Sequence, residues 1–563
     1  MLPNRWGQGQ LFAFSALDGE SFAGDDLCGT LMGDRIGIRF YLKTKRELSF
    51  VKQPHGCPEF EAVTGDLIKC RFANGKTLKI VFSKRNLIVG VTGGAYPIVF
   101  TEGPFDATDE NGCEIVNTLD GDFTALKREG DKFAFAFAHT KEDAVSLAEE
   151  GMKADIASEE AKKTAYYEKN GLSEGAPYAK LFAKCLSVMK TQLYSPEKEF
   201  DTVWSTPDRL PHRHLWLWDS VFHAVGHRHQ DAALAQDLIR AIWVHQGENG
   251  YVPHMADLGM ASGVTQPPVI AWGALKVFEK SGNMDFLKEV FEKNARFLKW
   301  CERERRKSDA QLYTWKTTID KNCRCDECGM DNSPRFDTLH ELYAIDFTCF
   351  MANDVRSMAE IADILGKHEE ASFYRTWFEN IRDAVNNTLW SEEDGFYFDY
   401  DIEDNRLHKV WSVASFLPLF AGLCSDKQAK ALIAHLNDPE SFKTEMPIPS
   451  ISVKDKTFGS DMWRGPVWIN YNVMISEGLN RYGENALADE IIDKTVFHMN
   501  KWYEETGTIF EFYDSVSMKT PKVLNRKGVF FEPYGFEMRM QSIRDYGWSC
   551  TLLCDILKRK YGN

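Results

Sequence analysis

The segment Gly329-Met-Asp-Asn-Ser-Pro-Arg-Phe-Asp337 lies in a long link between two stretches, 285–307 and 337–365, whose apolar residues recur at intervals of three and four. That spacing predicts a helix on each side of the link. The link itself combines acidic and aromatic residues with a proline, whereas the link before residue 285, Ser281-Gly-Asn-Met284, is short. Long and short links that alternate in this way indicate a helical domain with one elaborated end.

The same apolar spacing continues through the carboxy-terminal part of the chain and predicts twelve helices. The predicted helices are 175–193, 219–229, 231–246, 267–281, 285–307, 337–365, 368–389, 411–423, 426–436, 465–482, 484–502 and 541–559. No strong repeat of about 34 or 40 residues is visible, so a superhelical repeat array is not expected. Twelve helices without a repeat fit an (α/α)6 barrel, in which six outer and six inner helices alternate around a closed ring.

Long links precede every second predicted helix, and all of them carry acidic and aromatic residues. Besides 329–337 they are Trp216-Leu-Trp-Asp-Ser220, Glu248-Asn-Gly-Tyr-Val-Pro-His254, Asp394-Gly-Phe-Tyr-Phe-Asp399, Asp461-Met-Trp-Arg-Gly-Pro-Val-Trp468 and Glu511-Phe-Tyr-Asp514. In an alternating barrel these links all emerge at the same end. Functional side chains concentrate on loops that a rigid scaffold holds, so we expect the functional site at this end.

The first 140 residues have a different pattern, typical of β-strands. Short alternating runs occur at 36–42, 78–82 and 87–91, and the turn signals Asn74-Gly75 and Asn111-Gly112 separate such runs. A β-sandwich is the natural architecture for this region. The stretch 141–174 is rich in Ala, Glu and Lys without a strong apolar stripe and is interpreted as a helical linker. The predicted chain is therefore multidomain α and β: a sandwich over 1–140, the linker, and the barrel over 175–563.

Composition and charge exclude several classes of protein. With 44% hydrophobic and 27% charged residues and no long apolar run, the 563-residue chain is not expected to span a membrane. The formal net charge is −16, with Lys and Arg dispersed, which argues against nucleic acid or an anionic membrane surface as partner. Thirteen scattered cysteines and a start without a secretory signal favour a reducing, cytoplasmic location.

Acidic residues in links that share one barrel end suit one particular chemistry. Cleavage of a glycosidic bond uses two carboxyl groups on opposite sides of the sugar, one of which protonates the leaving oxygen. In inverting enzymes the other deprotonates a water molecule, and the two groups stand about 6.5–9.5 Å apart to leave room for it. Carboxylates far apart in sequence can meet this requirement.

Two runs, Asp331-Asn-Ser-Pro-Arg335 and Trp463-Arg-Gly-Pro-Val-Trp468, are specific enough to carry a family resemblance. Together with Trp218-Asp-Ser220, Gln266-Pro-Pro268 and Glu511-Phe-Tyr-Asp514, they resemble glycoside hydrolase family 63. That family includes processing α-glucosidase I and the bacterial mannosylglycerate and glucosylglycerate hydrolases, and it is related to the trehalases. The resemblance implies an (α/α)6 barrel, inversion at the anomeric carbon and no cofactor.

On the matching positions, the resemblance implies Asp331 as general acid and Glu511 as general base. Without it, Asp331 would be interpreted as a helix N-cap, and Glu511 as a surface carboxylate on a short hairpin. A general acid must hold a proton at neutral pH, and the neighbouring carboxylates Glu327 and Asp337 would favour this. Four other carboxylates rival Glu511 as the base, namely Glu504, Glu505, Asp514 and Glu532.

The resemblance also implies contacts to the sugar. Trp218 would pack against a sugar face and Asp219 would accept hydrogen bonds from hydroxyls, although an aromatic helix start with an Asp cap explains the pair as well. Trp463 and Arg464 are interpreted in the same way. Gln266 is either a helix-entry residue or a hydroxyl ligand. The two specific runs add two further substrate contacts, Arg335 and Trp468.

Two clusters contain metal-ligating residue types. Cys323, Cys325 and Cys328 lie just before Asp331, but a structural zinc site usually needs four ligands, and no second pair is evident. We therefore expect free thiols and no metal. His223 and His227 fit one helix face, yet no glutamate base stands between them, so a structural role is expected.

The sequence as a whole predicts an inverting exo-α-glycosidase, an α-glucosidase in the first instance, that acts on a short oligosaccharide or glycoside. A glucosylglycerate, mannosylglycerate or trehalose-type hydrolase is the alternative within this chemistry. A sugar epimerase would need facing histidines, which fall mostly outside the long links. A non-catalytic carbohydrate-binding protein remains the alternative of another class.

Overall fold

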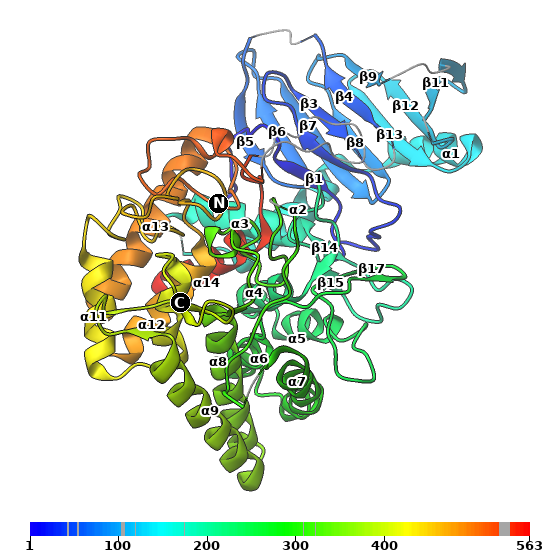
Figure 1. Ribbon diagram of the computed structural model, residues 1–563. Coiled ribbons are helices and arrows are strands. Elements are labelled where there is room, and N and C mark those ends of the chain that lie inside the picture. The colour runs from blue at the N-terminus through cyan, green and yellow to red at the C-terminus, as the bar shows by residue number, and fades with distance from the viewer. Residues whose placement is uncertain are drawn as a thin grey trace. The chain divides into compact units, whose positions relative to one another are not determined.

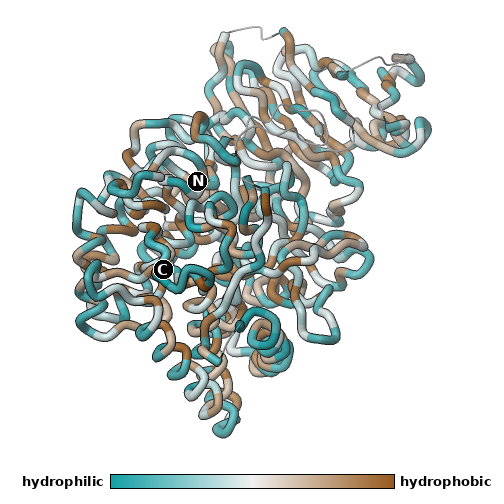
Figure 2. The backbone as a smooth tube through the Cα atoms, viewed as in Figure 1, coloured by the Kyte–Doolittle hydropathy of each residue, from teal (hydrophilic) through white to brown (hydrophobic). Residues whose placement is uncertain are grey.

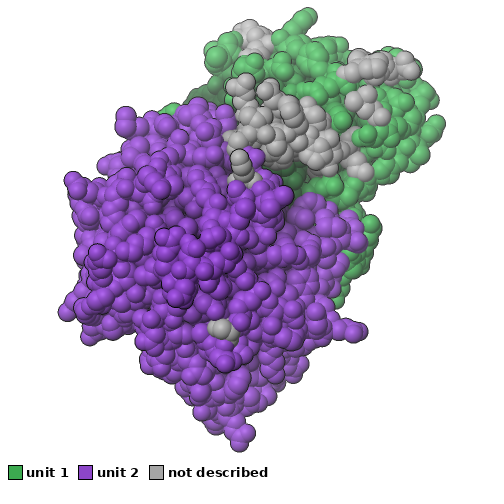
Figure 3. Space-filling model, in the orientation of Figure 1, with its two compact units in different colours: residues 1–213, 500–509, 544–563 green, residues 214–499, 510–543 purple. Residues whose placement is uncertain are grey.

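The structure is a computed structural model, and it describes residues 1–562 apart from 42–43, 53–55, 103–106, 119, 174, 308, 321 and 528–540. The chain divides into two compact units, which Figure 3 shows in two colours. Unit 1 comprises Met1–Arg213, Asn500–Ile509 and Arg544–Asn563, and unit 2 comprises His214–Met499 and Phe510–Ile543.

Unit 1 contains two antiparallel sheets. The first has the strand order β1-β2-β3-β4-β9, with bounds Leu11–Ala13, Cys28–Leu31, Gly37–Phe40, Arg46–Phe50 and Pro97–Thr101. The second has the order β10-β11-β12-β13-β8-β7-β6-β5. Its bounds in that order are Ala107–Glu110, Cys113–Asn117, Phe123–Glu129, Lys132–Ala138, Leu87–Val91, Thr77–Lys84, Leu67–Arg71 and Glu59–Val63. The strands predicted at 36–42, 78–82 and 87–91 correspond to β3, β7 and β8.

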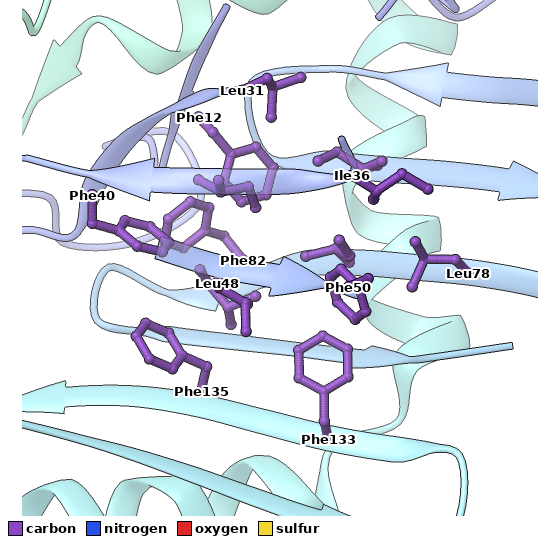
Figure 4. Close-up of a cluster of buried hydrophobic side chains, with 14 of the residues drawn as sticks. Phe12, Leu31, Ile36, Phe40, Leu48, Phe50, Leu78, Phe82, Phe133 and Phe135 are labelled. Carbon is purple, nitrogen blue, oxygen red and sulfur yellow. The ribbon is translucent and has the colours of Figure 1, made fainter. Parts of the chain in front are cut away.

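Apolar side chains from the two sheets meet in one core (Figure 4). The Phe40 ring of the first sheet stacks on Phe135 of the second at 5.5 Å between centroids, and Phe50 meets Phe133 edge-on at 5.5 Å. Alternate residues of a strand point to opposite faces, so the alternation in the sequence is what fills this layer. The two sheets form the predicted β-sandwich.

The helices of unit 1 are α1 (Lys141–Lys153), α2 (Ile156–Asn170), α3 (Ala179–Thr191) and α14 (Gly547–Tyr561). Helix α1 covers the second sheet, where it packs on β12 and β13, and α3 packs against α14. Unit 1 also has the short strands β14 (Leu193–Tyr194) and β15 (Trp204–Ser205).

Unit 2 is mainly helical (Figure 1). Its helices are α4 (Leu217–His227), α5 (Ala232–Ala241), α6 (Ile270–Ser281), α7 (Met284–Arg305), α8 (Ile345–Ile364), α9 (His368–Thr388), α10 (Leu417–Ala421), α11 (Asp426–Asn437), α12 (Ile469–Arg481) and α13 (Asn485–Thr506), the last of which ends in unit 1. Helices α4, α6, α8, α10 and α12 form a row in which each packs on the next. Helices α5, α7 and α9 pack on α4, α6 and α8. Inner and outer helices therefore alternate along the chain.

Short strands and 3-10 turns occupy the links of unit 2. The strands are β16 (Leu215–Trp216), β17 (Met255–Asp257), β18 (Met260–Ala261), β19 (Leu342–Tyr343), β20 (Trp390–Ser391), β21 (Phe396–Tyr397), β22 (Asp399–Asp401) and β23 (Arg406–His408). The 3-10 turns are η1 (Pro334–Phe336), η2 (Val413–Phe416) and η3 (Pro521–Val523).

Local sequence explains where the helices begin, end and turn their apolar faces. Asp231 accepts hydrogen bonds from the first N–H groups of α5, Asn283 does the same for α7, and Ser425 forms a capping box with Gln428 at α11. Gly282 ends α6 in the left-handed conformation. Buried residues of α9 recur every three or four positions, and its tube shows brown and teal in close alternation (Figure 2).

Each of the twelve predicted helices has a counterpart, but three of them begin six or more residues late, and the one predicted from residue 541 begins at Gly547. The helix predicted from residue 337 begins at Ile345, because Pro334 starts a 3-10 turn and β19 intervenes. Leu339 fits the apolar spacing of a helix, but its side chain is exposed and does not belong to a buried helix face. The helix predicted from residue 411 begins as the 3-10 turn η2. Among the described residues, no helix combines the length and the apolar character that a membrane span requires.

A buried charge network ties α2 and α3 to the sandwich within unit 1. Lys190 of α3 lies 2.7 Å from Asp66 and 2.8 Å from Asp18, and Lys163 of α2 also pairs with Asp18. Burial raises the pKa of Asp66, but the charges of Lys190 and Lys163 outweigh it and hold that pKa below its usual value. The network therefore stabilises unit 1 above the ordinary pKa of Asp, and its contribution falls at more acidic pH.

Replacing Lys190 with Met should destabilise unit 1. The substitution leaves the buried carboxylate of Asp66 with weaker compensation, and breaking a buried ion pair costs about 3–5 kcal/mol. Denaturant unfolding monitored by far-UV circular dichroism measures the loss. Lys162→Met is the matched control, because Lys162 is exposed in its pair with Glu159 and should change the free energy of unfolding by less than about 1 kcal/mol. Equal effects of the two substitutions would contradict the structural role of the network.

Candidate active site

All the predicted site residues belong to unit 2 and lie in its long links or in the helix turns that follow them. Trp218 and Asp219 are in the first turn of α4, and Gln266 precedes α6. Asp331 and Arg335 lie between α7 and α8, and Trp463, Arg464 and Trp468 precede α12. Glu511 follows α13.

Asp331 forms an ion pair with Lys527 near the protein surface. Its carboxylate is also 3.6 Å from the Sγ atom of Cys323, and Lys527 Nζ is 3.0 Å from the same sulfur. Burial would lower the pKa of Lys527, but the negative charge of Asp331 outweighs this effect and raises it. Lys527 therefore carries its charge at neutral pH.

Glu511 is buried, with 2% of its side chain exposed, and forms a two-point ion pair with Arg526. Arg526 Nε lies 2.7 Å from Oε2 of Glu511, and Nη2 lies 3.1 Å from Oε1. The backbone N–H of Glu511 donates to the carbonyl of Ile543 at 2.9 Å. A bidentate pair fixes the orientation of a carboxylate as well as its charge. The alternative of a surface carboxylate does not fit this burial.

Asp461 fastens the segment that carries both cations. Its Oδ1 atom accepts hydrogen bonds from the backbone N–H of Lys527 at 3.2 Å and from Nδ2 of Asn332 at 3.1 Å. Asn332 follows Asp331 directly, and Lys527 follows Arg526. One carboxylate thus ties the link of Asp331 to the segment that pairs with Glu511.

Asn332 also holds the link before α12. Its Oδ1 atom accepts the N–H of Trp463 at 3.0 Å, and its carbonyl accepts Arg464 Nε at 2.8 Å. Arg464 reaches further to an ion pair with Asp337 at 2.5 Å. Two links more than a hundred residues apart are thereby joined along their length.

Trp218 packs against the same link from α4. Gly329 has a φ of +70°, and a Cβ atom there would stand 2.3 Å from the Trp218 ring. Only glycine fits this contact and this backbone conformation. The backbone N–H of Trp218 donates to Oε1 of Gln266 at 3.2 Å. The side-chain oxygen of Gln266 therefore caps the first turn of α4, and Asp219 is buried beside Trp218. A contact of Gln266 with a sugar hydroxyl stays a prediction.

Trp463 and Trp468 stack on each other. Their ring centroids are 3.9 Å apart with an interplanar angle of 2°, and both side chains are buried. Trp468 also contacts Phe512, the neighbour of Glu511, at 4.9 Å. The stacked pair therefore packs between the link before α12 and the segment that carries Glu511. A direct contact of either ring with sugar stays a prediction.

Arg335 is fully buried between two carboxylates. Its nitrogens lie 2.6–2.8 Å from Asp346 and 2.7 Å from Asp399. A guanidinium whose three nitrogens all serve buried carboxylates has no donor directed at a substrate. This geometry favours a structural role, in place of the substrate contact expected from its position in the Asp331–Arg335 run.

The two carboxylates expected to assist Asp331 have partners of their own. Glu327 is buried, pairs with Arg305 at 2.6 Å and accepts the N–H groups of Thr265 and Lys316. Asp337 pairs with Arg464. The contacts of both carboxylates therefore hold links together. The carboxylate that shares a hydrogen-bonding partner with Asp331 is Asp326. The thiol of Cys323 contacts the side chains of both residues.

Most of the rivals of Glu511 are engaged elsewhere. Glu504 and Glu505 belong to unit 1, where Glu504 pairs with Arg5. Asp514 accepts the backbone N–H groups of Met518 and Lys519, each at 2.9 Å. Glu532 lies outside the described residues. Among the described rivals, Glu511 alone is connected to Asp331 through the Arg526–Lys527 segment.

The histidines of α4 are buried in the helix packing. Burial lowers the pKa of His223 to about 3 and that of His227 to about 4. Such imidazoles are neutral at pH 7 and do not act as general acids there. His254 lies closer to the site: burial lowers its pKa to about 4, although the charge of Asp331 acts in the opposite direction.

The cysteines before Asp331 do not converge. Cys325 and Cys328 are buried, and the Cys328 thiol donates to the carbonyl of Cys325 at 3.1 Å. Cys323 instead lies beside Asp326, Asp331 and Lys527. All thirteen cysteines lie among the described residues, and none of them forms a disulfide.

Sequence reasoning missed four residues that organise this site, namely Asn332, Asp461, Arg526 and Lys527. Asn332 and Asp461 stand inside or beside the two specific runs, so their positions were a usable signal. No sequence signal marks Arg526 and Lys527, because a basic dipeptide in a link is common. Their partners, Glu511 and Asp331, lie 15 and 196 residues away in the chain.

Comparisons with known proteins place the helical part of the chain in one family. Residues 212–549 match the profile of the mannosylglycerate hydrolase MGH1-like glycoside hydrolase domain. An uncharacterised protein of Borreliella burgdorferi is 28% identical over 234 residues, 41% of this chain and 47% of that protein. The mannosylglycerate hydrolase of Rubrobacter radiotolerans is 24% identical over 405 residues, 55% of this chain and 88% of that protein.

A solved structure shares the fold. The GH63 mannosylglycerate hydrolase of Thermus thermophilus, determined in complex with Tris, superposes with a TM-score of 0.55 at 22% identity. The superposition covers 67% of this chain and 99% of that chain. The likeness shows that the two chains share a fold over the superposed part. The chain spans about half of the Borreliella protein and most of the Rubrobacter enzyme.

Replacing Arg335 with Lys separates the structural role of Arg335 from a substrate contact. Lysine cannot serve Asp346 and Asp399 with the same fork of donors, and each lost hydrogen bond to a charged group costs about 1.5–3 kcal/mol. We expect a loss of about 2–5 kcal/mol in denaturant unfolding. Arg464→Lys is the control, because Arg464 is partly exposed and should cost less than about 1.5 kcal/mol. A stable Arg335→Lys protein with a tenfold higher KM would instead restore the predicted sugar contact.

Proposed function

The chain belongs to the mannosylglycerate hydrolase MGH1-like glycoside hydrolase family and is a glycosidase, and we propose that it is an inverting, exo-acting α-glycoside hydrolase. Asp331 is the general acid and Glu511 is the general base. The observation that carries this assignment is the Arg526–Lys527 segment. Through it, two carboxylates that are 180 residues apart in sequence are held by consecutive residues.

The environments of the two carboxylates suit different roles. Glu511 is buried and its ion pair with Arg526 is bidentate, so the direction of its carboxylate is fixed, which suits a base that must meet a water molecule in one orientation. Asp331 is the more exposed of the two, with 16% of its side chain accessible. To donate a proton it must first bind one, so the contact with Lys527 has to open when substrate enters.

The reaction follows from these roles. Asp331 protonates the glycosidic oxygen of the leaving group while Glu511 removes a proton from a water molecule on the opposite face of the sugar. The water attacks the anomeric carbon directly, so an α-glycoside yields a β-sugar and no covalent intermediate forms. No step in this scheme needs a cofactor.

The proposed scaffold is an (α/α)6 barrel. The row formed by α4, α6, α8, α10 and α12, with α5, α7 and α9 packed on its members, supports this architecture within unit 2. We propose that the sandwich comprises residues 1–140, the helical linker 141–174 and the barrel 175–563. We propose a reducing, cytoplasmic location, which the odd number and scattered positions of the thirteen cysteines favour.

The substrate is a short α-linked oligosaccharide or glycoside. Relatives named mannosylglycerate hydrolase make glycosylglycerates the first compounds to test, and α-glucosides are the other class, as the family resemblance implies. Trp218, Asp219 and Arg464 are the proposed sugar contacts. Trp463 and Trp468 are proposed to pack against the sugar as a stacked pair.

Asp331→Asn and Glu511→Gln should each lower kcat by about 10²–10⁴, because each removes one general acid–base contribution. A panel of α-linked disaccharides and glycosylglycerates identifies the substrate, and proton NMR of the first product formed by the wild-type protein shows its anomer. We expect the β-anomer.

Asp337→Asn is the matched control for the acid, because Asp337 is exposed and pairs with Arg464. It should retain kcat within about tenfold. Initial release of the α-anomer would mean retention through a nucleophile and would contradict the role of Glu511 as a base. Full activity of Glu511→Gln would transfer that role to another carboxylate.

A further inference from the structure

Cys323, Asp326 and Asp331 present one sulfur and two carboxylates to a common point. Their donor atoms all lie within 4.8 Å of one another. The thiol of Cys323 donates to Asp326, and its sulfur is 3.6 Å from Oδ2 of Asp331. The turn that carries them is closed by a hydrogen bond from the N–H of Cys325 to the carbonyl of Asp331 at 3.3 Å.

A second observation shows that this point already accommodates a cation. The ammonium of Lys527 reaches it from another part of the chain, pairing with Asp331 and standing 3.0 Å from the sulfur of Cys323. Lys527 brings one positive charge to two carboxylates. The cluster therefore has an excess of negative charge in its own contacts, and a divalent cation would match it better than the ammonium does.

The donor set is typical of zinc and related metals. Zn²⁺ binds thiolate at about 2.3 Å and carboxylate at about 2.0–2.2 Å, so tetrahedral ligands of one ion stand roughly 3.5 Å apart. The separation of 3.6 Å between Cys323 Sγ and Asp331 Oδ2 fits this value. A sulfur ligand selects softer metals over Mg²⁺ and Ca²⁺, which prefer oxygen alone.

We propose that Cys323, Asp326 and Asp331 form a binding site for a soft divalent cation such as Zn²⁺, and that the bound cation inhibits hydrolysis. Binding replaces the thiol proton of Cys323, which is released to solvent, and displaces the ammonium of Lys527 from Asp331. Water completes the coordination. The inhibitory part of the proposal rests on the proposed role of Asp331 as general acid, since a carboxylate oxygen bound to a metal cannot deliver a proton.

Other described residues offer weaker alternatives. The buried thiol of Cys328 donates to the backbone carbonyl of Cys325, whereas Cys323 contacts Asp326 and Asp331, so the zinc set suggested by the three-cysteine spacing does not form. His340, Asp401 and Asp404 also converge, but Asp404 is paired with Arg406, and Oδ1 of Asp401 accepts the backbone N–H groups of its own turn. At that second cluster no side-chain cation among the described residues bridges the donor atoms.

Binding is tested with Co²⁺ alone, without substrate, because thiolate-bound Co²⁺ absorbs strongly in the near ultraviolet. We expect one equivalent of this absorption in the wild-type protein, its displacement by Zn²⁺, and its loss in Cys323→Ser. Cys57→Ser is the matched control, because Cys57 is an exposed thiol in unit 1; it should keep the absorption and full activity. An unchanged absorption in Cys323→Ser would overturn the site.

Inhibition is tested separately with Zn²⁺ and substrate. Cys323→Ser should weaken inhibition at least tenfold, as the loss of a ligand requires. Lys527→Met should bind Co²⁺ more tightly, by roughly tenfold, because the competing ammonium is gone. Weaker binding in Lys527→Met would overturn the idea that the two cations compete. Stoichiometric binding that leaves activity intact would overturn the inhibitory role alone, and it would count against Asp331 as the acid.

Discussion

Each of the two candidate catalytic carboxylates is held by a cation on one of two consecutive residues, Arg526 and Lys527. The rest of the site depends on this constraint, because it sets the position of one carboxylate relative to the other. Asp461 fixes the segment by accepting the N–H of Lys527, and it reaches Asn332 with the same oxygen. The link before α12 is then fastened to Asn332. Hydrogen bonds and ion pairs thus fix links that are distant in sequence relative to one another within the site.

The two ion pairs differ in a way that suits the chemistry proposed for each carboxylate. Glu511 is buried and bidentately bound, so the direction of its carboxylate is fixed before substrate arrives. Asp331 is partly exposed and its partner is a lysine, whose flexible side chain and single point of charge make a looser contact. A base that activates water benefits from the first arrangement. An acid that must gain and lose a proton in every turnover needs the second.

Much of the fold could be predicted from the sequence, because helical periodicity survives wherever one helix face is buried. All twelve predicted helices were found, and errors arose where an exposed residue such as Leu339 imitated the period. At the site, the two specific runs located both the proposed acid and the link that fastens it. The partners could not be predicted: Arg526 and Lys527 have no pattern, and the commitment of Arg335 to Asp346 and Asp399 is visible only in three dimensions.

The most direct test of the account uses a substrate that needs no acid. In an α-glycosyl fluoride of the sugar that the enzyme cleaves, fluoride leaves without protonation, whereas attack by water still requires a base. The account predicts that Asp331→Asn hydrolyses this fluoride within about tenfold of the wild-type rate, while Glu511→Gln loses about 10²–10⁴. If Asp331→Asn were as impaired on the fluoride as on a natural glycoside, Asp331 would not be the proton donor and the assignment of the two carboxylates would be wrong.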